Sequence, residues 1–307
     1  MKIRWLCPAI FAVTMLAGCG SNSPLAEDLK RYTTSPEDHA AQSPEPFAEA
    51  RRVRIRALDN TPYVSLQDVM STTGLRGARL QDGSYGVGDH DPIWSFQAGE
   101  RKATVDGKQR ELAAPALEER DELYIPLSAL QSLFGDVAIF KVESRHVEFY
   151  PRTTDKHIDA HRESADFSDA VSAKSTATVN MIAYAKNFLG VNYDFGAGSY
   201  AQSGKFDCSS YVQHVFGHFG IDMPRTAREQ AQGGTPVSSS SLIPGDLLFF
   251  NVPGTFKNRQ AVGHVGIYMG EGNMIHASPA GDNGVQITPV NSRYWQNNFL
   301  HARRYVQ

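Results

Sequence analysis

The sequence predicts an α+β fold in two units. In the second half of the chain, helical segments come first and strand-like segments follow, an order typical of an antiparallel sheet with its helices grouped together. In the first half, short strand-like segments alternate with turns such as Asp82-Gly83 and Asp106-Gly107. The length of 307 residues and the hydrophobic fraction of 41% are sufficient for two cores.

Residues 1–18 have the layout of an export signal. Basic residues open the segment, and the apolar run from Trp5 to Leu16 is too short to cross a membrane. The next residues, Leu16-Ala17-Gly18-Cys19, resemble the lipobox of bacterial lipoproteins. This resemblance implies an exported chain in which Cys19 carries acyl groups such as palmitate, which anchor it to the outer face of the bacterial cell membrane. An ordinary secretory signal with a chance cysteine is the alternative.

A tether and a small domain are expected next. Residues 19–50 are rich in Ser, Pro, Glu and Ala and show no lasting apolar periodicity, which predicts a disordered, solvated tether. Residues 51–152 predict a small α+β domain with an internal echo. Tyr63-Val64-Ser65-Leu66 and Tyr124-Ile125-Pro126-Leu127 each predict a strand that runs into a helix. The second segment and its continuation resemble the stalk repeat called copper amine oxidase N-terminal-like, without implying copper.

The remainder of the chain divides into a linker and a second domain. Residues 153–177 are polar and predict the linker, and residues 178–307 predict the domain. Its first helix is expected to begin after Thr178 as N-cap and to end at Gly190. The expected apolar face of this helix comprises Val179, Ile182, Ala183, Lys186 and Leu189. The strands expected in this domain are 246–251, 263–269, 274–278, 285–290 and 299–306.

A cysteine stands at the start of another predicted helix, in the segment Phe206-Asp207-Cys208-Ser209. Asp207 is a good N-cap, and apolar residues follow at helical spacing until Gly220. A thiol on the first helical turn lies beside backbone N–H groups that lack an intrahelical partner, and this environment favours the nucleophilic thiolate. The alternative is a small buried apolar residue, the usual state of a free cysteine.

The other two cysteines bear on the state of Cys208. Cys7 leaves with the export signal and Cys19 would carry lipid, so Cys208 would be the only free thiol of an exported protein. An unpaired thiol in that setting suggests reactivity.

Two histidines on neighbouring predicted strands are candidates for a base and its orienting group, which a cysteine nucleophile needs. His264 opens one strand and His276 lies on the next. An odd-numbered loop or a bulge between the strands would place both rings on one face, and an even-numbered loop would separate them. Because Gly270 and Gly272 favour a three-residue loop with a bulge, we predict a shared face, with His264 nearer to Cys208. Taken singly, each could be a half-buried strand histidine.

Together these segments resemble the NlpC/P60 family of papain-like cysteine peptidases over residues 179–307. The motifs that carry the resemblance occur in the family's order and are Val191 to Gly196, Phe206 to Ser209, Met223 to Thr226 with Glu229-Gln230, Ile243 to Phe250, Gly263 to Tyr268 and Ile275 to Ala277. The sequence departs from the family's pattern at Ala197 and Ser210, where the family usually has glycine.

The resemblance implies hydrolysis of peptidoglycan stem peptides, at the bond between γ-D-glutamyl and a diamino acid. It implies that Cys208 attacks the carbonyl carbon, that His264 carries the proton, and that His276 orients His264. It further implies that Tyr193 and the N–H of Cys208 stabilise the oxyanion.

The resemblance also assigns roles around the nucleophile. Asp207 would cap the helix and, with Ser209, shape the pocket for substrate. Loop 251–262 is expected to form a wall of the groove. Arg225, Lys257 or Arg259 could meet a substrate carboxylate, but each is expected to be a solvated surface charge.

Composition and spacing argue against several other partners. The formal net charge of −3 leaves no basic stripe for nucleic acid. The thiol, its two histidines and Asp207 could in principle hold zinc, but the chain has no Cys-x-x-Cys or His-Glu-x-x-His motif, so we expect no metal and no cofactor. His90 and His146 of the first domain lack metal-ligand spacing and are expected to lie on a solvated surface.

Two other functions remain compatible with the sequence. The thiol chemistry could serve an amidase or an acyl transferase acting on another amide, or the domain could be a non-catalytic module that binds the cell wall. A thiol with two histidines argues against the binding module, which needs no such trio. We expect a monomer.

Overall fold

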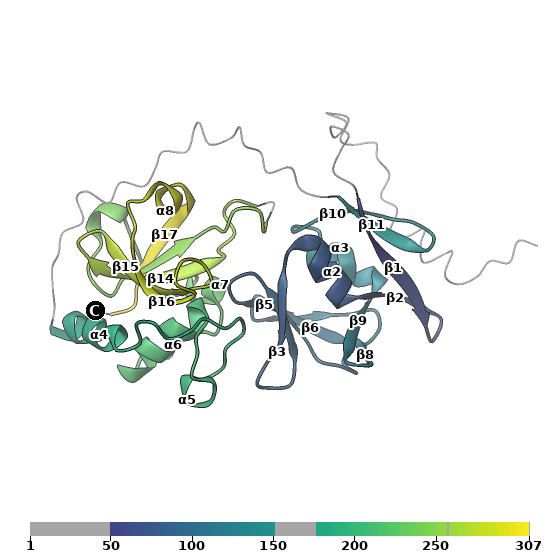
Figure 1. The fold of residues 1–307 in the computed structure, drawn as a ribbon, viewed down its shortest axis with the longest axis horizontal. Coiled ribbons are helices and arrows are strands. Elements are labelled where there is room, and N and C mark those ends of the chain that lie inside the picture. The colour runs from purple at the N-terminus through teal and green to yellow at the C-terminus, as the bar shows by residue number, and fades with distance from the viewer. Residues whose placement is uncertain (1–49, 151–175, 257, 307) are drawn as a thin grey trace, which may run out of the picture.

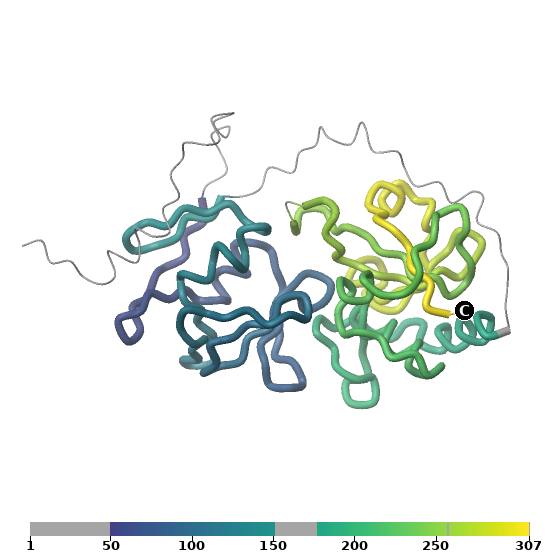
Figure 2. Tube along the Cα trace, turned by 180° about the vertical axis from the view of Figure 1, so that it is seen from behind, coloured from purple at the N-terminus to yellow at the C-terminus, as the bar shows by residue number. Residues whose placement is uncertain are grey.

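The computed structural model describes residues 50–150, 176–256 and 258–306, which form two units side by side (Figures 1 and 2). The predicted export signal, almost all of the tether, and residues 153–175 of the predicted linker lie outside the described residues. Both units combine helices with antiparallel sheets, so the predicted α+β class is confirmed. Within the described residues, no helix is long and apolar enough to span a membrane.

The first unit contains a six-stranded antiparallel sheet. In spatial order its strands are β10 (Ile139–Val142), β11 (His146–Tyr150), β1 (Arg51–Leu58), β2 (Thr61–Ser65), β9 (Glu122–Pro126) and β8 (Leu117–Glu119). The two similar segments predicted from the sequence pair with each other here, with Val64 opposite Ile125. Strand β2 runs into α2 (Leu66–Thr73), and β9 runs into η2 (Leu127–Ala129) and α3 (Leu130–Phe134). The expectation of a strand leading into a helix is confirmed for both.

A second sheet of the first unit is a five-stranded meander. Its strands are β3 (Arg76–Arg79), β4 (Tyr85–Gly88), β5 (Pro92–Phe96), β6 (Lys102–Val105) and β7 (Lys108–Glu111). Successive turns of a meander lie at alternate ends of the sheet, so the β4–β5 turn at residues 89–91 and the β6–β7 turn at residues 106–107 share one end. Both of these turns contact the second unit.

The second unit is built around one six-stranded antiparallel sheet. In spatial order its strands are β12 (Thr235–Val237), β17 (Phe299–Arg304), β13 (Leu247–Phe250), β14 (His264–Gly270), β15 (Asn273–Ser278) and β16 (Gly284–Pro289). Its helices are α4 (Thr176–Lys186), α5 (Tyr200–Ser203), α6 (Cys208–His218), α7 (Ala227–Gln230), η3 (Ser239–Ser241) and α8 (Arg293–Asn298).

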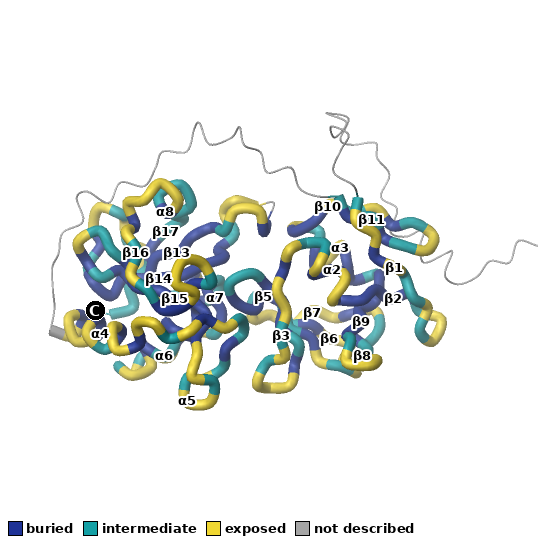
Figure 3. Tube along the Cα trace, in the orientation of Figure 1, coloured by how far each residue is buried: buried dark blue, intermediate teal, exposed yellow. Residues whose placement is uncertain are grey.

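Helix α6 packs on the centre of this sheet. Its apolar residues Tyr211, Val215 and Phe216 share a core with Val265 and Ile275 of strands β14 and β15. The opposite face of the sheet is covered too, by a smaller cluster. Strand β14 is therefore buried along almost its whole length and is drawn dark blue in Figure 3. A side chain at the start of α6 is thus fixed against a rigid sheet.

The predicted apolar face of the first helix of this unit is wrong by one position, although Ile182, which belongs to it, is buried as expected. Val179 and Leu189 are 46% and 45% exposed, whereas Met181 and Phe188 are buried. The helix also begins at Thr176, so Thr178 lies inside it and is not its cap. Two apolar stripes at helical spacing overlap in this segment, and the stripe with the larger Met and Phe side chains is the one that packs inward.

Candidate active site

The start of α6 is organised by a capping box. The Asp207 carboxylate accepts a hydrogen bond from the Ser210 N–H at 2.8 Å, and the Ser210 hydroxyl accepts one from the Asp207 N–H at 2.9 Å. The predicted N-cap is confirmed, and Ser210 has a defined role at a position where glycine would leave the Asp207 N–H without this partner. The box places Cys208 on the first turn, with no exposed surface.

A β-bulge brings His264 and His276 to the same face of the sheet. The register between β14 and β15 pairs Ile267 with Ile275 but shifts before Gly270. His264 Nε2 then lies 2.7 Å from His276 Nδ1, and His276 Nε2 lies 2.9 Å from the Thr288 hydroxyl. The prediction of a shared face is confirmed, although the loop between the strands has two residues and not three.

Burial keeps both histidines neutral. Desolvation and then the nearby His90 lower the pKa of His264 well below its ordinary value. The same two causes lower the pKa of His276 to about 3. A neutral imidazole that is oriented through one ring nitrogen is the form in which histidine can accept a proton.

The Cys208 thiol lies beside the first residues of β14. A hydrogen bond from the Val265 backbone stabilises its thiolate, but burial, followed by the charges of Asp91 and Asp207, raises its pKa well above the ordinary value. The expectation that the helix terminus favours thiolate is therefore wrong for this arrangement. Desolvation and two neighbouring carboxylates outweigh the helix terminus, whose charge is already offset by the Asp207 cap.

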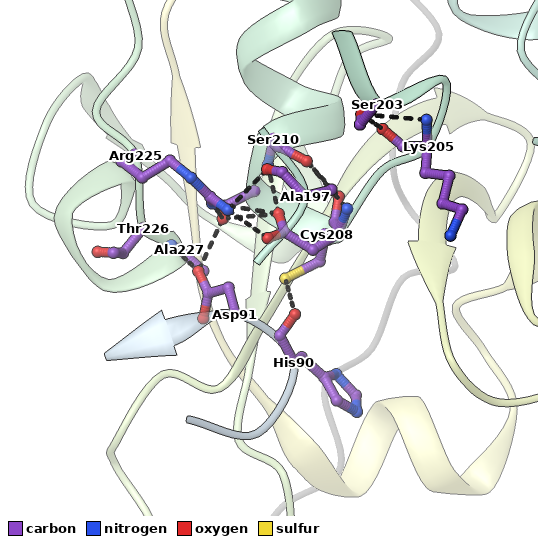
Figure 4. A network of polar contacts seen from close by, with 12 residues as sticks. His90, Asp91, Ala197, Ser203, Lys205, Cys208, Ser210, Arg225, Thr226 and Ala227 are labelled. Atoms are coloured by element: carbon purple, nitrogen blue, oxygen red, sulfur yellow. Dashed lines mark hydrogen bonds and ion pairs between the residues drawn. The ribbon is translucent and has the colours of Figure 1, made fainter. Parts of the chain in front are cut away.

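His90 of the first unit contacts Tyr193, Cys208 and His264 of the candidate site. Its carbonyl oxygen accepts a hydrogen bond from the Tyr193 hydroxyl at 2.6 Å. The Cys208 thiol contacts the same oxygen at 3.7 Å (Figure 4). Its ring Nδ1 lies 2.8 Å from His264 Nδ1. The expectation of a solvated His90 is wrong, because the turn that carries it contacts Cys208 and His264 of the second unit.

Asp91, the next residue, anchors the turn. It is almost fully buried, and its carboxylate accepts hydrogen bonds from the Ser209 hydroxyl at 2.8 Å and from the Ala227 N–H at 2.6 Å (Figure 4). Burial, and then the charge of Asp207, raise the pKa of Asp91 to about 7. Sequence reasoning gave no role to this residue, since its partners lie 118 and 136 residues away.

Arg225 compensates the buried carboxylates. Its guanidinium forms an ion pair with Asp207 and donates hydrogen bonds to the Ser209 hydroxyl at 2.9 Å and to the Ala197 carbonyl at 3.0 Å. Arg225 is therefore a partner of Asp207, which corrects the expectation of a solvated surface charge. The pair holds the loop before α6 against the segment that leads into α7.

The structure brings together all the candidate residues of the second unit. Tyr193 reaches the site because it forms an isolated bridge with Phe206, two residues before Cys208. The gathered set is Tyr193, Asp207, Cys208, Ser209, His264 and His276. Cys19 lies outside the described residues. In the part of the chain that the structure describes, no group of three or more His, Cys, Asp or Glu side chains could hold a metal ion.

A thiol on a helix N-terminus, packed against a sheet that carries two linked histidines, is the arrangement expected from the resemblance of the sequence to papain-like cysteine peptidases. The family model described as NlpC/P60 family matches residues 190–304. The C-terminal part of this chain is thus an NlpC/P60 domain.

Similar proteins match over part of this chain. The Bacillus subtilis protein named bifunctional muramidase/DL-endopeptidase CwlT is 35% identical over 159 residues, which are 52% of this chain and 43% of that protein. The Escherichia coli protein named murein DD-endopeptidase MepS/murein LD-carboxypeptidase is 38% identical over 119 residues, which are 38% of this chain and 57% of that protein. The chain thus spans about half the length of these relatives.

A solved structure from Staphylococcus aureus, described as similar to lipoprotein and of the NLP/P60 family, aligns at 30% identity. The alignment covers 46% of this chain and 45% of that chain, with a TM-score of 0.38.

Proposed function

We propose that this protein is a cysteine peptidase that hydrolyses peptidoglycan stem peptides, at the bond between γ-D-glutamyl and a diamino acid. The observation that carries the proposal is the 2.7 Å contact between His264 and His276, with His264 next to Val265, whose backbone bonds the Cys208 sulfur. Because this contact occupies Nε2 of His264, Nδ1 is the ring nitrogen that would accept the proton of the thiol.

In the acylation step, His264 Nδ1 takes the proton from Cys208 and the sulfur attacks the carbonyl carbon of the scissile amide. His276 holds the His264 ring in place by accepting the hydrogen bond of its Nε2–H. The imidazolium then returns the proton to the departing amine of the diamino acid, which leaves a thioester between Cys208 and the γ-carbonyl of glutamate.

The tetrahedral intermediate carries a negative oxygen that needs hydrogen-bond donors. The Tyr193 hydroxyl and the Cys208 N–H are the proposed donors. The hydroxyl supports this role, because it already donates to a carbonyl oxygen that lies 3.7 Å from the Cys208 sulfur. Water then attacks the thioester, His264 accepts a proton from that water, and the thiol is restored as the new carboxylate leaves.

Asp207 and Ser209 are proposed to shape the adjoining substrate pocket. Asp207 lies at the buried start of α6 and Ser209 forms its second residue, with its hydroxyl 3.3 Å from the Asp207 carboxylate. The ion pair with Arg225 fixes the carboxylate. These positions can discriminate charged groups of a substrate close to the reacting carbon.

We further propose that the protein acts outside the cytoplasm, held at the outer face of the cell membrane by lipid on Cys19. Support comes from the lipobox-like Leu16-Ala17-Gly18-Cys19 after a short apolar run. The names of both relatives refer to enzymes that act on the cell wall, which lies outside the membrane.

The test is digestion of purified muropeptides, read by mass spectrometry. The proposal predicts release of a fragment that ends in L-Ala-D-Glu, and a rate at least about a thousandfold lower for Cys208→Ala. Cleavage at another amide that still requires Cys208 would retain the thiol chemistry but change the bond. Cleavage that survives in Cys208→Ala would contradict the mechanism.

A further inference from the structure

We propose that the β4–β5 turn of the first unit, residues 89–91, is a built-in inhibitor that occupies the active site as a substrate would. The proposal rests on the assignment of Cys208 and His264 as nucleophile and base. It concerns regulation of that site by a segment of the same chain.

The His90 carbonyl lies where the carbonyl of a substrate is expected. Its oxygen accepts the Tyr193 hydrogen bond at 2.6 Å, from the proposed oxyanion donor, and is 3.7 Å from the Cys208 sulfur. One peptide carbonyl therefore contacts both the nucleophile and the oxyanion donor. An external amide cannot take this position while the turn remains.

The His90 ring explains why the bound turn is not itself cleaved. The 2.8 Å contact joins Nδ1 of His90 to Nδ1 of His264, and the other His264 nitrogen is bonded to His276. Whichever His264 nitrogen carries the proton, both are engaged, so neither can accept the Cys208 proton. The nucleophile is thus left as a neutral buried thiol with no available base.

Three further contacts hold the turn in place. Asp91 receives the Ser209 and Ala227 hydrogen bonds described above, and Asp89 accepts a hydrogen bond from the Thr255 hydroxyl. Gly88 allows the turn to close, because a Cβ there would lie 1.9 Å from the Asp91 carbonyl oxygen. The turn thus has a defined conformation and a polar partner on each side.

The other contacts between the units keep the turn close to the site. Arg228 of the second unit contacts both carboxylate oxygens of Asp106, at 3.0 and 3.1 Å, on the neighbouring turn. Phe256 is buried in the core of the first unit near Trp94, with ring centroids 6.2 Å apart. A tethered competitor of this kind acts at a high effective concentration. Free substrate must therefore compete with a segment that the rest of the chain holds next to the active site.

The experiment measures two rates on the full chain, for the wild type, His90→Ala and the control His146→Ala. The first is alkylation of Cys208 by iodoacetamide, followed by mass spectrometry of the peptide that contains Cys208. The second is cleavage of muropeptides. His146 lies in the same unit and contacts Glu148 on the far strand β11, so its loss removes a histidine without touching the turn.

We expect His90→Ala to raise both rates about fivefold, the effect of losing one hydrogen bond, and His146→Ala to leave both unchanged. Asp91→Ala, which removes two other anchors, is the second variant and is expected to raise both rates further. Circular dichroism and thermal unfolding verify that each variant is folded.

Each other outcome has a defined meaning. Wild-type alkylation rates in both His90→Ala and Asp91→Ala would overturn the inhibitor. Faster alkylation with slower muropeptide cleavage would also overturn it, since the turn would then be part of the working site. Faster alkylation with no cleavage by any variant would support occlusion by the turn and contradict the proposed substrate.

Discussion

At the scale of single residues, the reactivity of Cys208 depends on what surrounds its sulfur. The helix terminus and the Val265 N–H favour thiolate, whereas complete burial and the carboxylates of Asp91 and Asp207 favour the neutral thiol. Burial and the two carboxylates have the larger effect, so the pKa of Cys208 is raised. Removal of the β4–β5 turn would take away Asp91 and part of the burial together, so one movement would both uncover the thiol and lower its pKa.

His276 is expected to act by positioning His264. His276→Ala should lower kcat for muropeptide cleavage on the order of 100-fold, because the His264 ring loses the partner of its Nε2. His276→Asn should retain most of the activity, since an amide oxygen can accept the same hydrogen bond. The pH profile of kcat/KM should shift in the alanine variant and stay close to wild type in the asparagine variant. Equal loss in both variants, with unchanged profiles, would contradict a positioning role.

The buried histidines should make the protein sensitive to acid. The pKa of His276 is lowered to about 3, so the folded state stays neutral at this residue while the unfolded chain takes up a proton below about 6.5. This contribution to stability is present above pH 6.5 and is lost as the pH falls towards 3. His90 and His264 act in the same direction, because their pKa values are lowered too.

Asp91 acts in the opposite direction. Its pKa is raised to about 7, so its contribution is present below about pH 4 and is lost as the pH rises towards 7. We expect the combined effect of the three histidines on the free energy of unfolding to exceed that of Asp91. Urea unfolding should show that the free energy of unfolding decreases as the pH is lowered from 7 to 4. The slope of this free energy against pH should correspond to about one proton fewer in His276→Asn. A slope unaltered by this substitution would contradict a neutral His276.

At the scale of the element, the α6 terminus combines structural and functional constraints. The capping box satisfies backbone N–H groups that would otherwise be unpaired, and it holds the nucleophile on the first turn. The cap residue Asp207 is also the partner of Arg225. A change in the cap should therefore affect both the stability of the helix and the placement of the thiol.

Ser210 provides the test of this element. Ser210→Ala should lower the free energy of unfolding by about 1 kcal/mol, since the Asp207 N–H loses its partner. The matched control is Ser71→Ala, which removes an exposed hydroxyl that donates a hydrogen bond to the Asp68 carbonyl of the same helix. That control should change stability by less than about 0.5 kcal/mol. Equal effects of the two substitutions in urea unfolding would show that the box contributes little.

At the scale of the whole molecule, the two units are coupled through polar turns and one aromatic side chain. Phe256 belongs to a loop of the second unit but is buried in the core of the first, where the Arg228 guanidinium lies 4.1 Å from its ring centroid. The loop that contains Phe256 thus connects the units, whereas its predicted role as a groove wall stays a prediction. This coupling keeps the inhibitory turn close to Cys208.

Phe256→Ala should uncouple the units. We expect a loss of about 3 kcal/mol, the low end for a buried phenylalanine, and a change from one calorimetric transition to two. The control is Ile139→Ala, at a large apolar side chain that is 54% exposed. It should leave the number of transitions unchanged. A single transition in Phe256→Ala would indicate that the polar contacts alone couple the units.

The separation along the chain between interacting residues determined which features could be predicted from the sequence. The helix at Cys208, its cap and the shared face of His264 and His276 follow from residues close together in the chain, and these predictions agree with the structure. The insertion of His90 could not be predicted, because no local pattern relates a turn of one unit to a helix 118 residues away. The buried face of α4 was missed because two apolar stripes fit the same segment.

The most direct measurement is muropeptide digestion by three full-length proteins: wild type, His90→Ala and the double variant His90→Ala/Cys208→Ala. We expect slow release of the L-Ala-D-Glu fragment by wild type, faster release by His90→Ala, and none by the double variant. Intact muropeptides in His90→Ala, together with rapid alkylation of Cys208, would contradict the claim that this thiol cleaves the peptidoglycan stem peptide.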